Sequence, residues 1–203
     1  MATAFHADVQ DVKNFVIASV VLGAAFASFY HDYTVSAAIF YLGLGALVLL
    51  ARETGMRLIA QWMESYSDLS VSRQGALTTL FGAILAVLTG WPILLLFPVY
   101  SNLSSKKYEH WGKSIDSVWM KRQFWFHLAA IVSLLIGWAV FYSYSLMGVA
   151  QAFALFAFFQ AMPLDYSLTP VNDLDGAYIL RWSGFIWLLV TGTSIIAIVL
   201  SFA

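Results

Sequence analysis

Apolar runs alternate with short polar stretches along this chain, and most of the runs are long enough for membrane helices. A helix that spans a bilayer needs roughly 17–25 mostly apolar residues. The runs are Asn14–Tyr30, Val35–Met63, Gly75–Tyr100, Phe124–Tyr144, Gly148–Met162 and Gly176–Phe202. The pattern predicts an all-α fold, a polytopic membrane helical bundle with five to six apolar segments, in a single domain of residues 1–203.

The polar stretches between these runs are short, and we expect loops there. The three longest are Glu64–Arg73, Ser101–Lys121 and Pro163–Asp175, of which Ser101–Lys121 is the longest. No repeat or linker divides the chain, which agrees with one domain.

Composition supports the membrane assignment and excludes other classes. Of the 203 residues, 61% are hydrophobic and 10% are charged, whereas a soluble domain carries about 25% charged residues. The net charge is -1, so there is no electrostatic basis for binding nucleic acid. The chain has no Cys, which excludes disulfides and thiolate metal sites.

The run Gly75–Tyr100 has two interpretations, because Pro92 and Pro98 interrupt it and proline kinks or breaks a helix. It either spans the membrane or forms a re-entrant hairpin. In the hairpin interpretation the N-terminus and the basic loop Ser101–Lys121 share one side. Loops rich in Lys and Arg stay cytoplasmic, so this arrangement predicts a multi-pass protein of the cell membrane with both regions cytoplasmic and the C-terminus outside.

One apolar run turns charged within its second half. The stretch Leu49–Gln61 contains Arg52, Glu53 and Arg57 on a segment that otherwise reads as a membrane helix. Ionisable side chains at membrane depth are costly and are functional-site candidates by default.

Two stretches together resemble the site-2 proteases, a family of intramembrane zinc metalloproteases. Leu49–Gln61 is similar to the family's His-Glu-x-x-His helix, and Leu174-Asp175-Gly176 after Pro163 resembles its later Leu-Asp-Gly element. The run that begins at Leu174 is especially similar to an archaeal branch. The resemblance implies a zinc held by two His and one Asp, with the Glu as general base.

The chain departs from that motif at both zinc-binding His positions. Arg52 stands at the first and Met56 at the second, while Glu53 and Asp175 match the base and the third ligand. A guanidinium offers only hydrogen-bond donors, and a Met thioether prefers soft metals such as Cu(I). The segment Leu164–Asp173 is also longer than the family pattern implies. We therefore expect no zinc, no cofactor and no hydrolysis.

Two environments are open for Arg52 at this point. The side chain could reach water from an interfacial helix end, or it could lie inside and pair with Asp173 or Asp175, placing a fixed cation where the family has its metal. The remaining histidines are His6, His31, His110 and His127. None pairs with another at ligand spacing, so we interpret His127 as a helical His hydrogen-bonded to a neighbour.

Two function hypotheses from different classes follow. The first is a catalytically inactive site-2-protease-like protein that acts as a structural or accessory subunit of a larger membrane complex. The second is an atypical active intramembrane metalloprotease, and Arg52 and Met56 favour the first. A transporter or channel is a third, weaker hypothesis. The expected partners are membrane lipid and other integral membrane subunits, with no nucleic acid and no soluble small-molecule substrate evident.

Overall fold

The computed structural model describes residues 9–104, 116–164 and 173–203. The described chain is mostly helical. It also contains two strands, one before and one after the third helix. The elements are α1 (Val9–Tyr30), α2 (Val35–Trp62), β1 (Tyr66–Val71), α3 (Arg73–Thr89), β2 (Val99–Ser104), α4 (Asp116–Ser143), α5 (Met147–Ala161), α6 (Asp175–Trp182) and α7 (Gly184–Phe202).

Within the described chain, four helices are long and apolar enough to cross a membrane. They are α1, α2, α7 and the Trp119–Ser143 part of α4, while α3 and α5 are shorter apolar helices. The helical membrane class agrees with the sequence prediction, but the count of five to six spanning segments is not confirmed.

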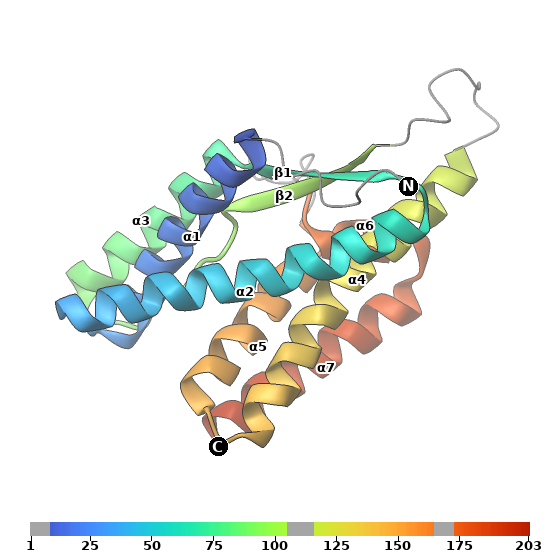
Figure 1. Cartoon of the computed structure of the whole chain (residues 1–203). Coiled ribbons are helices and arrows are strands. Elements are labelled where there is room, and N and C mark those ends of the chain that lie inside the picture. The colour runs from blue at the N-terminus through green and yellow to red at the C-terminus, as the bar shows by residue number, and fades with distance from the viewer. Residues whose placement is uncertain (1–8, 105–115, 165–172) are drawn as a thin grey trace.

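Helix α2 lies at the centre of the arrangement (Figure 1). Helices α1 and α3 lie on one side of it, and α4, α5 and α7 lie on the other (Figure 1). The crossing of α1 and α2 is close, because a Cβ at Gly45 would come within 2.7 Å of the Ser19 carbonyl oxygen. Small residues allow this kind of close backbone approach between membrane helices.

The run Gly75–Tyr100 leaves the two-stranded sheet and returns to it. Strands β1 and β2 are antiparallel, with Val71 opposite Val99, so α3 departs from the sheet and the chain comes back to it. Gly90 ends α3 in the left-handed region, with φ 69°, and the returning backbone N–H of Phe97 donates to Thr79 Oγ1 at 2.9 Å. The chain therefore leaves the sheet along α3 and folds back against α3 before it pairs with β1 as β2.

The structure corrects several expected boundaries. The stretch Glu64–Arg73 is not only loop, since it contains β1, and Ser101–Lys121 contains the end of β2 and the start of α4. The last apolar run is two helices rather than one. Ser183 is extended, with φ −151°, and its hydroxyl accepts the Ile186 N–H. A Ser at this position satisfies a free backbone donor of the next helix, so α7 restarts there.

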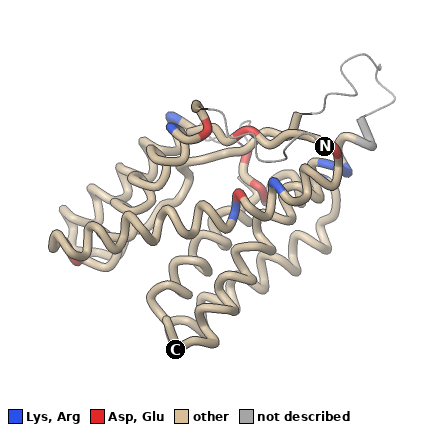
Figure 2. The backbone as a smooth tube through the Cα atoms, in the orientation of Figure 1, with Lys and Arg blue, Asp and Glu red and all other residues tan. Residues whose placement is uncertain are grey.

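Charged residues gather toward the strands, and the opposite end of the bundle is nearly free of them (Figure 2). The exception inside the bundle is a group of charges on α2 and α6 that lies where α2, α4, α6 and β2 meet. The fold thus brings the two sequence stretches Leu49–Gln61 and Leu174-Asp175-Gly176 to one place.

Candidate functional site

The site is built on the inward face of α2. Arg52 and Glu53 are 1% and 4% exposed, so both ionisable groups are removed from solvent. The alternative in which Arg52 reaches water from a helix end is therefore wrong. Burying an isolated charge is very costly, which requires that partners surround the guanidinium.

Asp175 is the main partner of Arg52. The Arg52 Nε–H donates to Asp175 Oδ2 at 3.1 Å, and the Nη2–H donates to Asp175 Oδ1 at 2.9 Å. This is a two-point contact between a planar guanidinium and a carboxylate, the strongest common form of ion pair. The structure contains the Arg52–Asp175 pair that the sequence predicted.

The remaining edge of the guanidinium faces Glu53 and Ser101. Arg52 Nη1 donates to Glu53 Oε1 at 2.6 Å and to Ser101 Oγ at 2.8 Å. The Ser101 hydroxyl in turn donates to the same Glu53 oxygen at 2.9 Å. Strand β2 thereby supplies a neutral hydroxyl that bridges the Arg52 guanidinium and the Glu53 carboxylate.

His127 approaches Asp175 from α4. Its Nδ1–H donates to Asp175 Oδ1 at 2.7 Å, and its Nε2 lies 3.0 Å from Gln123 Oε1. The imidazole also stacks on the Tyr178 ring of α6, with a centroid distance of 3.9 Å. His127 thus provides a second fixed donor to the Asp175 oxygen Oδ1, from α4.

The environment keeps Asp175 ionised. Burial raises the pKa of the Asp175 carboxyl, but the charge of Arg52 and the hydrogen bonds from His127 and Arg52 outweigh it and leave the pKa below its usual value. Asp175 is the first residue of α6, where the helix dipole also favours an anion.

Gly176 brings Asp175 this deep into the bundle. A Cβ at this position would collide with the Ala161 carbonyl at the end of α5. The absence of a side chain allows α6 to begin directly against α5, which positions the Asp175 carboxylate opposite Arg52. The Leu-Asp-Gly stretch therefore has a steric role in addition to its charge.

Two other sequence candidates lie outside this group. Asp173, the second expected partner of Arg52, forms an ion pair with Arg181 at 3.0 Å. Met56 is fully buried in an apolar cluster with Ala60 and Phe126. In the described part of the chain, no group of three or more His, Asp or Glu side chains is arranged to hold a metal ion.

Sequence reasoning missed the roles of Ser101 and His127. The hydrogen bond of His127 to a neighbour was expected, but the identity of that neighbour was not. One signal was present, since His127 is a polar residue within an otherwise apolar run. Ser101 had no such signal, because it follows a Pro-interrupted segment whose path the sequence leaves open. The histidines His6 and His110 and most of the segment Leu164–Asp173 lie outside the described residues.

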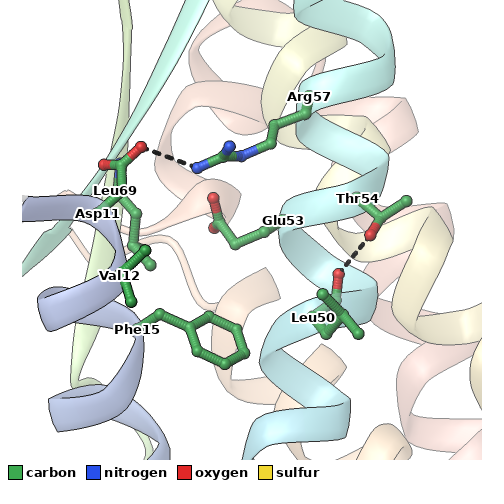
Figure 3. A pocket seen from close by; sticks show the side chains of 8 residues that line it. All are labelled: Asp11, Val12, Phe15, Leu50, Glu53, Thr54, Arg57 and Leu69. Carbon is green, nitrogen blue, oxygen red and sulfur yellow. Dashed lines mark hydrogen bonds and ion pairs between the residues drawn. The ribbon is translucent and has the colours of Figure 1, made fainter. Parts of the chain in front are cut away.

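A second ion pair lies further along α2, beside a cavity. Arg57 Nη2 donates to Asp11 Oδ2 at 2.9 Å, and Asp11 Oδ1 accepts the Leu69 N–H at 3.2 Å. The adjacent cavity of about 210 Å³ lies between α1 and α2 (Figure 3). It is lined by Asp11, Val12, Phe15, Leu50, Glu53, Thr54, Arg57 and Leu69.

The chemical state of the two carboxylates differs. Both oxygens of Asp175 accept hydrogen bonds, three in all, so each oxygen of this carboxylate has a fixed partner. Glu53 uses only Oε1, and its Oε2 is buried without a hydrogen-bond partner in the described part of the chain. The site thus consists of the Arg52–Asp175 ion pair and one acceptor, Glu53 Oε2, that lacks a donor among the described residues.

Comparisons with known proteins do not add to this picture: no family model, no curated protein and no solved structure matches the chain.

Proposed function

We propose that this chain is a non-catalytic membrane protein similar to the site-2 proteases, and that it works as a structural or accessory subunit of a larger membrane complex. The observation that carries the proposal is the two-point pair of Arg52 with Asp175. In the family, the matching Asp is a zinc ligand. Here its oxygens face a permanent organic cation.

The chemistry of the cluster supports the absence of hydrolysis. An arginine guanidinium remains protonated in proteins and cannot donate a lone pair to a metal. Glu53, which matches the family's general base, has Oε1 engaged by Arg52 and Ser101. A general base requires a water activated by another group, and Arg52 supplies no such activation.

An accessory role fits the way the chain is divided between spanning helices and shorter elements. The described residues outside the four spanning helices form a two-stranded sheet, three short helices and their connections. These elements pack on the spanning helices and offer little separate surface for an independent activity. Contacts with other integral membrane subunits and with lipid are the remaining role for such a chain.

The proposed orientation places the N-terminus and the basic loop Ser101–Lys121 in the cytoplasm and the C-terminus outside. The return of the chain from α3 to β2 beside β1 supports it, because α3 then changes no side. The excess of Lys and Arg near the strands agrees with the rule that basic loops stay cytoplasmic. Single Cys residues at Ser104 and Ala203 that label from opposite sides of intact cells would support this orientation, and labelling from one side would refute it.

The test of the function is chemical cross-linking in native membranes, followed by purification of this chain and sizing of the intact complex. We expect a defined complex larger than the chain alone, with unchanged composition in Glu53→Gln. A chain that purifies alone would refute the subunit role. Stoichiometric zinc that is lost in Asp175→Ala, or cleavage of a membrane substrate that is lost in Glu53→Gln, would instead favour the protease.

A further inference from the structure

The cavity between α1 and α2 has features that the ion-pair cluster does not account for. Its volume is about 210 Å³. Val12, Phe15, Leu50 and Leu69 form the apolar half of its lining, and Glu53 is among the polar lining residues. Figure 3 shows the Glu53 carboxylate reaching from α2 toward α1 and Leu69.

Glu53 Oε2 is the polar atom that a ligand in this cavity could supply with a hydrogen-bond donor. Glu53 is 4% exposed, and Oε2 has no hydrogen-bond partner among the described residues. A buried carboxylate oxygen without a donor costs free energy, so a donor group in the cavity would be favoured there. The other oxygen is held by Arg52 and Ser101, which fixes the carboxylate and leaves Oε2 as its buried, unpaired oxygen.

The balance of charge selects the type of donor. The buried cluster contains one Arg and two carboxyl groups, Glu53 and Asp175, so with both carboxyl groups ionised and His127 neutral it carries one excess negative charge. The Arg57–Asp11 pair beside the cavity is balanced within itself. A cationic donor would neutralise the excess, whereas an anionic group would increase it.

We propose that this cavity binds a primary-ammonium amphiphile, with its ammonium donating to Glu53 Oε2 and its chain lying against Val12, Phe15 and Leu50. The ammonium supplies the missing donor and the missing charge, and the apolar wall supplies the contact for the chain. The source is either an aminophospholipid of the bilayer or a free alkylamine. The inference does not depend on the proposed function.

The first experiment measures binding of hexylamine to the full chain in phosphatidylcholine nanodiscs, with hexanol and hexanoate as matched probes. Because charge-assisted hydrogen bonds are roughly twice as strong as neutral ones, we expect hexylamine to bind about tenfold more tightly than hexanol. Hexanoate should bind most weakly. Equal affinity for hexylamine and hexanol would overturn the proposal, because it would show that Glu53 supplies no charge to the ligand.

Two variants of α1 locate the site without touching the ion pairs. Val12 and Val16 are both 55% exposed on α1, but only Val12 lines the cavity. Val12→Phe should fill the space and reduce hexylamine affinity by about tenfold or more, which corresponds to about 1.4 kcal/mol, whereas Val16→Phe should leave it within twofold. Equal effects of the two variants would overturn the location.

Glu53→Gln tests the recognised atom. It should remove the preference for hexylamine over hexanol while keeping binding of hexanol. If this variant does not fold, the pair Val12→Phe and Val16→Phe still decides the proposal.

The source of the ligand follows from a lipid arm of the same experiment. Mass spectrometry of the protein released from mixed phosphatidylethanolamine and phosphatidylcholine nanodiscs reports which lipid it retains. Retention of phosphatidylethanolamine by the unmodified chain and Val16→Phe, but not by Val12→Phe, assigns a bilayer lipid. Tight hexylamine binding without such retention supports the proposal with a free amine as the source.

Discussion

Two arginines on α2, five positions apart, differ in how completely they are buried and in how many partners they have. Arg52 is 1% exposed and donates to Asp175, Glu53 and Ser101. The Arg57 side chain is 14% exposed and pairs with Asp11 of α1. The two side chains belong to the same helix and the same residue type, so the difference comes from what packs against each face of α2.

The two ion pairs also connect different elements of the fold. The Arg52 pair joins α2 to α6 across 123 positions of sequence, and His127 extends it to α4. The Arg57 pair joins α2 to the beginning of α1, and its Asp11 also accepts the Leu69 N–H of β1. Removal of one partner from a buried pair leaves an uncompensated charge, whereas a more accessible pair leaves a charge that water can reach.

The largest effect should follow loss of Arg52. Arg52→Met keeps an apolar chain of similar length but leaves Asp175 and Glu53 buried without their cation. We expect the free energy of unfolding to fall by about 3–5 kcal/mol, measured by titration with a denaturing detergent. A loss below about 1 kcal/mol would mean that water reaches the cluster.

A large effect should also follow a change beside the buried pair. Gly176→Ala places a Cβ against the Ala161 carbonyl and displaces Asp175 from Arg52. We expect a loss of about 1–3 kcal/mol, typical of overpacking. Gly192→Ala in α7 is the matched control, because nothing lies within 4 Å of a Cβ there, and it should be neutral or slightly stabilising.

The more accessible pair should matter less. Arg57→Met removes the ion pair with Asp11, whose other carboxylate oxygen accepts the Leu69 N–H. We expect a loss of about 1 kcal/mol, near the upper end for pairs that water can reach, by the same detergent titration. A loss as large as that of Arg52→Met would remove the distinction between the two arginines.

The smallest effect concerns pH. The pKa of Asp175 is lowered in the folded chain, so its stabilising charge is present above about pH 4, the usual value for Asp, and is lost as pH falls through the lowered pKa. The cost of Asp175→Asn should therefore stay constant between pH 7 and pH 5 and shrink below about pH 4. A cost that grows as pH falls would contradict this sign.

The contrast between the two arginines also marks how far sequence reasoning reached. The apolar runs predicted the long helices because spanning length is a property of local composition, and Arg52 stood out because a charge in such a run requires a partner. Asp175 was identifiable from the resemblance of Leu174-Asp175-Gly176. The choice between Asp173 and Asp175 was not, because it depends on how Gly176 packs against Ala161.

The contributions of β1, Ser101 and Glu53 Oε2 could not be predicted for a related reason. Strand β1 is a short polar stretch whose pairing with β2 depends on the return of the chain after α3. Ser101 reaches the cluster only through that pairing. The open acceptor on Glu53 exists because α1 and α2 cross closely near Gly45 and leave a cavity at their other ends.

The most direct test of the account is the energetic coupling between Arg52 and Asp175. It requires the free energy of unfolding of Arg52→Met, Asp175→Asn and the double variant in the same detergent. We predict that the double variant loses less than the sum of the single losses, with a coupling of about 2–3 kcal/mol, because residues in one buried network are not additive. Losses that add to within about 0.5 kcal/mol, as for independent sites, would contradict the claim that this pair is the centre of the fold.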